Sequence, residues 1–193
     1  MLAGVFKSWA RRLAEPLAMG LAKLGVTPNI LTVVGFGLNL IVAAILALGH
    51  VQIGGVLLLI VSAFDMLDGT LARSTNQVTK FGAFLDSTLD RYSEGAIYAG
   101  LLVALSNRSD TLGIVLVVIA LIGSLMVSYT RARAEGVGIS CEVGLLARPE
   151  RIIVLGVGLL LDQPVLALAI VAALANFTAA QRVMHVWQVT KGR

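Results

Sequence analysis

The sequence predicts an all-α integral membrane protein, with six transmembrane helices preceded by an N-terminal amphipathic interfacial helix. Hydrophobic residues make up 58% of the 193 positions, and the mean hydropathy is +0.90. Only 13% of the residues are charged, about half of the ~25% found in soluble domains. The charges also gather in short segments between apolar stretches, several of which reach the ~20 residues that cross a bilayer. A disordered chain is therefore excluded, and the composition disfavours a water-soluble globule.

The elements follow in order along the chain. Residues 2–22 alternate apolar and basic positions, which predicts an amphipathic helix lying in the membrane interface. The fifth apolar run, Ile152–Leu161, is short, so that span is expected to start near Leu145 with a polar first turn facing the protein. We expect one domain over residues 1–193, with a six-helix bundle over 30–188. The six predicted spans are Ile30–Leu48, Ile53–Arg73, Phe81–Leu105, Leu112–Ala134, Leu145–Leu161 and Val165–Trp187.

The cations predict an orientation for these spans. If both termini are cytoplasmic, Arg108 is the one Lys or Arg of the 15 that falls on the outer side. Such a partition is typical of the positive-inside rule, and a misplaced span would scramble it. The high isoelectric point therefore fits a membrane location, and no basic tract interleaved with aromatic residues indicates nucleic-acid binding.

Four aspartates lie within apolar, helix-forming sequence at the cytoplasmic ends of the second and third spans. Each would cost about 2.5–3.5 kcal/mol inside a membrane unless something offsets it. Their spacing, i, i+3 and i, i+4, puts each pair on one helix face. Because oxygen ligands select hard cations, the set predicts a site for one or two Mg²⁺ or Mn²⁺ ions. The four are Asp65, Asp68, Asp86 and Asp90.

Small residues accompany these acids. Gly69, Ala72 and Gly82 remove side-chain bulk beside the carboxylates, so that a ligand can approach the helix backbone. Arg73 offers a planar fork for phosphate next to the metal site. The complete pattern is Asp65-x-x-Asp68-Gly69-x-x-Ala72-Arg73, eight residues, Gly82-x-x-x-Asp86-x-x-x-Asp90.

This pattern resembles the signature of the CDP-alcohol phosphatidyltransferase family. Members are membrane enzymes with six transmembrane helices, usually homodimers, that move a phosphatidyl group from a CDP-linked lipid to an alcohol and release CMP. The resemblance implies that Asp65, Asp68 and Asp86 bind metal, and that Asp90 is a further ligand and the general base. It also implies that the CDP-lipid is held by Gly69, Ala72, Arg73 and Gly82. Direct in-line attack is expected, because no Ser, Cys or His stands out as a covalent nucleophile.

A second group of charges follows the fourth span. The segments Ser128-Tyr129-Thr130-Arg131-Ala132-Arg133-Ala134-Glu135 and Arg148-Pro149-Glu150-Arg151 resemble the branch of the family that makes phosphatidylinositol phosphate. That branch joins inositol 1-phosphate to CDP-diacylglycerol. The likeness implies an acceptor-phosphate pocket formed by Ser128, Arg131, Arg133, Arg151 and Arg182. Ordinary membrane anchoring of the arginines is the simpler interpretation.

Two rival functions remain open at this level. The first keeps the chemistry and uses glycerol 3-phosphate as the acceptor, giving phosphatidylglycerol phosphate. The second is a six-span cation transporter that uses the intramembrane aspartates, although it has no ready use for the fixed small residues and Arg73. Diacyl and archaeal diether lipid donors are equally compatible with the sequence.

Overall fold

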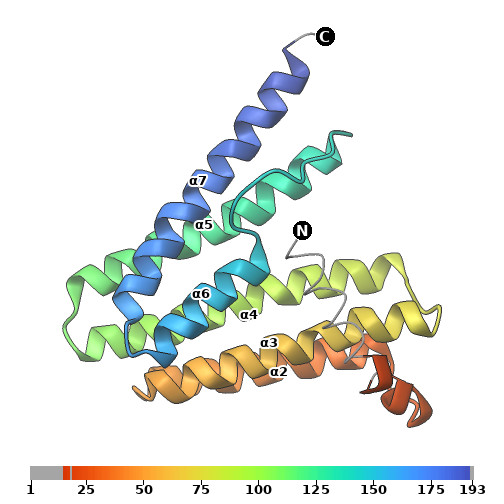
Figure 1. The fold of residues 1–193 in the computed structure, drawn as a ribbon, viewed down its shortest axis with the longest axis horizontal. Coiled ribbons are helices and arrows are strands. Elements are labelled where there is room, and N and C mark those ends of the chain that lie inside the picture. Colours follow the sequence, from red (N-terminus) through yellow and green to blue (C-terminus); the bar gives the residue numbers. More distant parts are fainter. Residues whose placement is uncertain (1–14, 18, 192–193) are drawn as a thin grey trace. The chain divides into compact units, whose positions relative to one another are not determined.

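The computed structural model describes residues 15–17 and 19–191, and this part of the chain is helical with no strands. The helices α2 to α7 follow one another along the chain, and the longest connection between them, residues 137–147, joins α5 to α6 (Figure 1). They are α2 (Pro28–Ala47), α3 (Val51–Ser74), α4 (Lys80–Asn107), α5 (Thr111–Gly136), α6 (Arg148–Leu160) and α7 (Pro164–Thr190). Residues 15–17 and 19–23 are also helical. Most of the predicted amphipathic helix, over residues 2–22, lies outside the described residues.

Four of these helices, α2, α3, α5 and α7, are long and apolar enough to cross a membrane. Many of their large apolar side chains are exposed, including Ile60 and Ile122. A surface of this kind suits lipid rather than water. Helix α6 has 13 residues, or ~20 Å at 1.5 Å per residue. Helix α4 has 28 residues but several charges in its first half.

Helix ends agree with local sequence signals. The Thr27 hydroxyl lies 3.4 Å from the Ile30 amide and caps the start of α2. The Asp110 carboxylate accepts from the Gly113 amide at 2.8 Å and caps α5. Helix α6 begins at Arg148, later than the predicted start near Leu145, and Pro149 occupies its first turn, where a missing amide costs nothing.

The described helices belong to two compact units, and the boundary between them falls within α2, α3 and α4. Unit 1 comprises Met1–Ile41 and Ile60–Glu94. Its core contains Leu31 of α2 and Leu67 and Leu71 of α3, with Phe64 packed against them. All four predicted metal-site aspartates belong to unit 1.

Unit 2 comprises Val42–Leu59 and Gly95–Arg193. Helix α7 packs along α5 and also against α6 (Figure 1). The α5–α7 contact is close because Gly123 faces Asn176, whose amide donates to the Ile119 carbonyl at 3.2 Å. Small residues at such contacts let membrane helices approach closely. The predicted acceptor-binding arginines all belong to unit 2.

Candidate active site

The first pair of aspartates projects from α3 in unit 1. The Asp68 side chain is buried, with 8% of the residue exposed, and Asp65 is half-buried. Their i, i+3 spacing places both on one helix face, as the sequence predicts. A buried carboxylate needs hydrogen-bond donors to offset the loss of hydration.

Helix α2 supplies such donors. The Thr32 hydroxyl donates to Asp68 Oδ2 at 2.7 Å, and the other Asp68 oxygen accepts from the Gly69 amide. Asn39, of which only 4% is exposed, lies with its amide nitrogen 3.4 Å from Asp65 Oδ2 and 3.0 Å from the Gly35 carbonyl. Both carboxylates of α3 are therefore oriented by polar side chains of α2.

Gly35 contributes by having no side chain. A Cβ atom at this position would overlap Asp65 Oδ1 and lie 3.5 Å from Asp65 Cγ. Thr32, Gly35 and Asn39 were not predicted as site residues. Their spacing of i, i+3 and i+7 is a signal that would have found them, because it places two polar side chains and a glycine on one face of an apolar helix.

The small residues of the signature lie beside polar groups. A Cβ on Gly69 would lie 3.2 Å from Arg73 Nη1, so the guanidinium folds back over this glycine. At the start of α4, the Gly82 amide donates to the Thr79 hydroxyl at 2.9 Å, and a Cβ on Gly82 would lie 3.1 Å from Asn29 Oδ1. Glycine backbone next to the Arg73 guanidinium leaves room for a diphosphate group and offers it a bidentate donor.

The second pair of aspartates, Asp86 and Asp90, projects from α4 and is half-buried. Asp90 lies 3.9 Å from the Arg91 guanidinium, with 17% of the Asp90 side chain exposed. An aspartate side chain is a group type that can act as a general base, which is the role that the sequence predicts for Asp90.

The four carboxylates fit a hard divalent cation in donor chemistry, because each offers only oxygen ligands. The fixed orientation of Asp65 and Asp68 by α2 also resembles the outer hydrogen bonds that hold metal ligands. Within the described residues, no three acidic, histidine or cysteine side chains converge closely enough to hold a metal ion. The four aspartates therefore match a divalent cation in donor type, and Asp65 and Asp68 are also held in fixed orientations. That these aspartates bind the ion stays a prediction.

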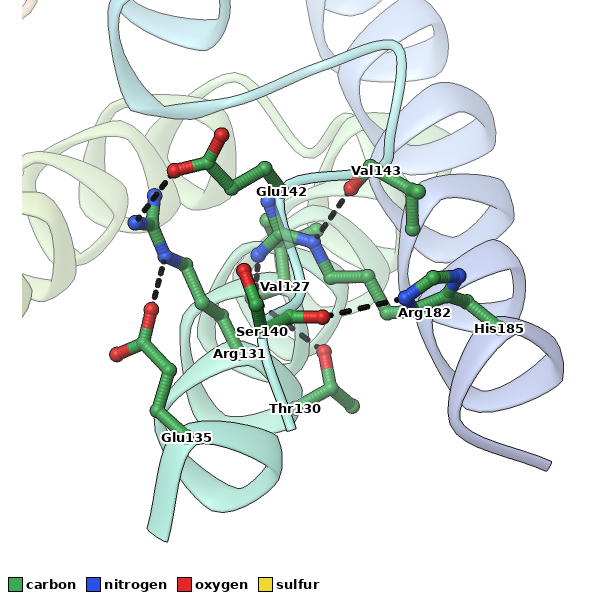
Figure 2. Close-up of polar contacts among 9 residues, drawn as sticks. All are labelled: Val127, Thr130, Arg131, Glu135, Ser140, Glu142, Val143, Arg182 and His185. Carbon is green, nitrogen blue, oxygen red and sulfur yellow. Dashed lines mark hydrogen bonds and ion pairs between the residues drawn. The ribbon is translucent and has the colours of Figure 1, made fainter. Parts of the chain in front are cut away.

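Two predicted acceptor-binding arginines are deeply buried in unit 2. Only 1% of Arg151 and 4% of Arg182 is exposed. Arg182 donates from Nε to the Val143 carbonyl at 2.9 Å and from Nη1 to the Val127 carbonyl (Figure 2). These bonds use two of its five N–H groups. All three of Arg131, Arg151 and Arg182 contact the segment 142–146, since Arg131 lies 3.9 Å from Glu142 and Arg151 Nη1 lies 3.5 Å from the Leu146 carbonyl. These three arginines are called the basic cluster below.

The remaining predicted acceptor residues lie on α5. Arg131 is about half exposed, donates to Glu135 at 2.8 Å and lies 3.9 Å from Glu142 (Figure 2). Arg133 is exposed and Ser128 is half-buried. Arg131 therefore belongs to the basic cluster, whereas Arg133 is exposed on α5.

One face of α7 holds the loop between α5 and α6. The Thr178 hydroxyl accepts from the Leu146 amide at 3.1 Å. Arg182 binds the Val143 carbonyl, and His185 lies 3.2 Å from the Ser140 carbonyl (Figure 2). Sequence reasoning assigned no partner to Thr178 or His185. Because their partners are main-chain groups more than 30 residues away, no side-chain pattern indicates them.

Comparison with known proteins places this arrangement in a family. A model described as CDP-alcohol phosphatidyltransferase matches residues 25–190. The archaetidylinositol phosphate synthase of Methanothermobacter thermautotrophicus is 38% identical over 192 residues, covering 96% of this chain and 94% of the relative.

Two solved structures of the Mycobacterium tuberculosis phosphatidylinositol phosphate synthase are also similar. The structure with CDP-DAG bound has a TM-score of 0.85 and 32% identity, covering 91% of this chain and 94% of the other. The structure in complex with manganese and citrate has a TM-score of 0.83 and 31% identity, covering 90% and 88%. With its aspartate signature, its apolar helices and these matches, this chain is an integral membrane protein that belongs to the CDP-alcohol phosphatidyltransferase family.

Proposed function

We propose that the chain transfers the phosphatidyl group of a CDP-linked lipid to inositol 1-phosphate, forming phosphatidylinositol phosphate and releasing CMP. The observation that carries the proposal is the complete aspartate signature, with all four aspartates in one compact unit and two of them oriented by α2. The relatives and solved structures that act on or bind the same class of molecules support it.

The chain's own residues divide the work. Gly69, Ala72, Arg73 and Gly82 hold the CDP portion of the lipid, with the Arg73 fork on phosphate oxygens. Asp90 accepts the proton of the attacking hydroxyl. Asp65, Asp68, Asp86 and Asp90 hold one or two Mg²⁺ or Mn²⁺ ions, an assignment supported by the manganese complex of a similar protein. A bound divalent ion supplies neutralisation of diphosphate charge during phosphoryl transfer.

The acceptor phosphate is bound by the basic cluster of Arg131, Arg151 and Arg182, together with the other two predicted residues, Ser128 and Arg133. Burial of Arg151 and Arg182 supports this role, because guanidinium groups shielded from water bind phosphate more strongly than exposed ones. Anchoring to headgroups, the simpler interpretation, does not require arginines that are 1% and 4% exposed.

We further propose that α4 and α6 also cross the membrane, giving six spans, with both termini and the site on the cytoplasmic side. The distribution of Lys and Arg supports this orientation. In a Cys141→Ser background, a cysteine at Arg108 should react with an impermeant maleimide from outside intact cells, and one at Lys80 should not. The reverse labelling would overturn the orientation.

A homodimer is expected, and chemical crosslinking in membranes tests it.

The activity is tested by measuring CMP release from the purified chain in detergent with Mg²⁺. CDP-diacylglycerol and a diether CDP-lipid serve as donors, each with inositol 1-phosphate or glycerol 3-phosphate. We expect release with inositol 1-phosphate. Release with glycerol 3-phosphate alone would support the rival acceptor, and cation flux into liposomes without CMP release would support a transporter.

A further inference from the structure

The polar face of α2 is the feature that the proposed roles leave unused. Thr32, Gly35 and Asn39 contact the carboxylates of Asp68 and Asp65, and none belongs to the signature. We propose that these three are positioning residues, which set the orientation of the two α3 carboxylates that receive the divalent cation. The inference deepens the proposed function and rests on it.

The contacts fix the orientation of both α3 carboxylates. At Asp68, Thr32 occupies Oδ2 at 2.7 Å and the Gly69 amide occupies Oδ1. At Asp65, Asn39 reaches Oδ2, while Oδ1 lies against the bare backbone of Gly35. A carboxylate whose oxygens already have fixed donors cannot rotate freely, so its remaining lone pairs point in fixed directions.

Gly35 provides the sharpest contrast within the same helix. A Cβ at Gly35 would overlap the Asp65 carboxylate, whereas a Cβ at Gly37, two residues further along, would meet no atom within 4 Å. Both substitutions to alanine raise helix propensity equally. Any difference between them therefore reports displacement of Asp65.

The threonine has a matched control on α3. Thr70 is buried, and its hydroxyl donates to the Met66 carbonyl of its own helix at 2.9 Å and not to a carboxylate. A Thr→Val change removes one hydroxyl at either position. Only the change at Thr32 removes a donor from Asp68.

The experiment measures Mn²⁺ affinity by electron paramagnetic resonance of the purified chain, without either substrate. Loss of an outer hydrogen bond typically weakens metal binding by about 10–100-fold. We expect weakening of about tenfold or more for Thr32→Val and Gly35→Ala. We expect Thr32→Ser, Gly37→Ala and Thr70→Val to stay within about twofold of the unsubstituted chain. In CMP release, the first two should raise the apparent KM for Mg²⁺ more than that for CDP-lipid.

Equal Mn²⁺ affinity for Gly35→Ala and Gly37→Ala, with Thr32→Ser no better than Thr32→Val, would overturn the proposal. Absence of Mn²⁺ binding by the unsubstituted chain would also overturn it. If Thr32→Val does not fold, the two glycine variants decide alone. Failure of the unsubstituted chain to release CMP overturns the proposed function instead, because the Mn²⁺ measurement needs neither lipid nor acceptor.

Discussion

The carboxylates of α3 and the arginine of α7 are held by different kinds of partner. Asp65 and Asp68 are oriented by side chains of the preceding helix, whereas Arg182 is oriented by the main-chain carbonyls of Val127 and Val143. A side-chain donor is removed by one substitution. A main-chain carbonyl is removed by no substitution, so the Arg182 geometry depends on the backbone of α5 at Val127 and of the α5–α6 loop at Val143.

The largest effect is expected at a carboxylate of the proposed metal site. Asp90→Asn removes the proposed proton acceptor and should lower kcat for CMP release by about 10²–10⁴-fold. CDP-lipid binding should change little, because the amide keeps the shape of the carboxylate. Asp110→Asn is the control, since Asp110 caps α5 by a bond to Gly113 and lies in the other unit. Near-normal turnover of Asp90→Asn would exclude Asp90 as the base.

The basic cluster should respond in KM rather than in kcat. Arg182→Lys keeps the charge but loses the fork that bonds two carbonyls. We expect the KM for the acceptor to rise about tenfold, with the KM for CDP-lipid nearly unchanged. Arg108→Lys, on an exposed turn, is the matched control. Equal increases in both KM values would show that Arg182 does not distinguish the acceptor.

The loop itself is tested at Gly144, which has a φ of +133° and whose Cβ would overlap Thr178 Cγ2. Gly144→Ala should destabilise the chain by more than the ~1–2 kcal/mol of a left-handed backbone alone. Gly138 has a φ of +79°, and a Cβ added there would meet no atom within 4 Å. Gly138→Ala is therefore the control for the cost of the backbone conformation alone. Thermal unfolding in detergent measures both.

Adding Thr178→Ser to Gly144→Ala separates the cost of the left-handed backbone from the cost of the overlap with Thr178 Cγ2. Serine keeps the hydroxyl that accepts from the Leu146 amide but removes Cγ2. The double variant should therefore recover stability to about the level of Gly138→Ala. No recovery would mean that the loop is not held against α7 in this way.

The two regions also differ in how far the sequence predicts them. The i, i+3 and i, i+4 spacing of acids within apolar helices predicts the four aspartates and their helix faces, because helical periodicity is local. The Thr32 and Asn39 contacts need only the pairing of two consecutive helices. The contacts of Arg182 join α7 to carbonyls 39 and 55 residues earlier. A main-chain carbonyl has no residue identity, so no pattern in the sequence specifies such contacts.

The smallest effect is expected at Arg131, the exposed member of the basic cluster. Arg131 and Glu135 form an exposed i, i+4 pair, worth about 0.3–0.5 kcal/mol. Glu135→Gln should therefore change the unfolding temperature little. If Arg131 binds the acceptor phosphate, loss of the competing carboxylate should lower the acceptor KM by about twofold, and most clearly at low salt.

Glu142 tests the effect on the acceptor KM at a longer distance. It lies 3.9 Å from the Arg131 guanidinium, whereas Glu135 lies 2.8 Å from it. Glu142→Gln should shift the acceptor KM in the same direction by a smaller factor, since Coulomb energy falls with distance. Equal shifts would indicate a general change in surface charge rather than release of Arg131. A rise in KM for Glu135→Gln would show that the ion pair holds Arg131 in its binding position, which would make Arg131, like Arg182, a residue whose geometry is set by its partners.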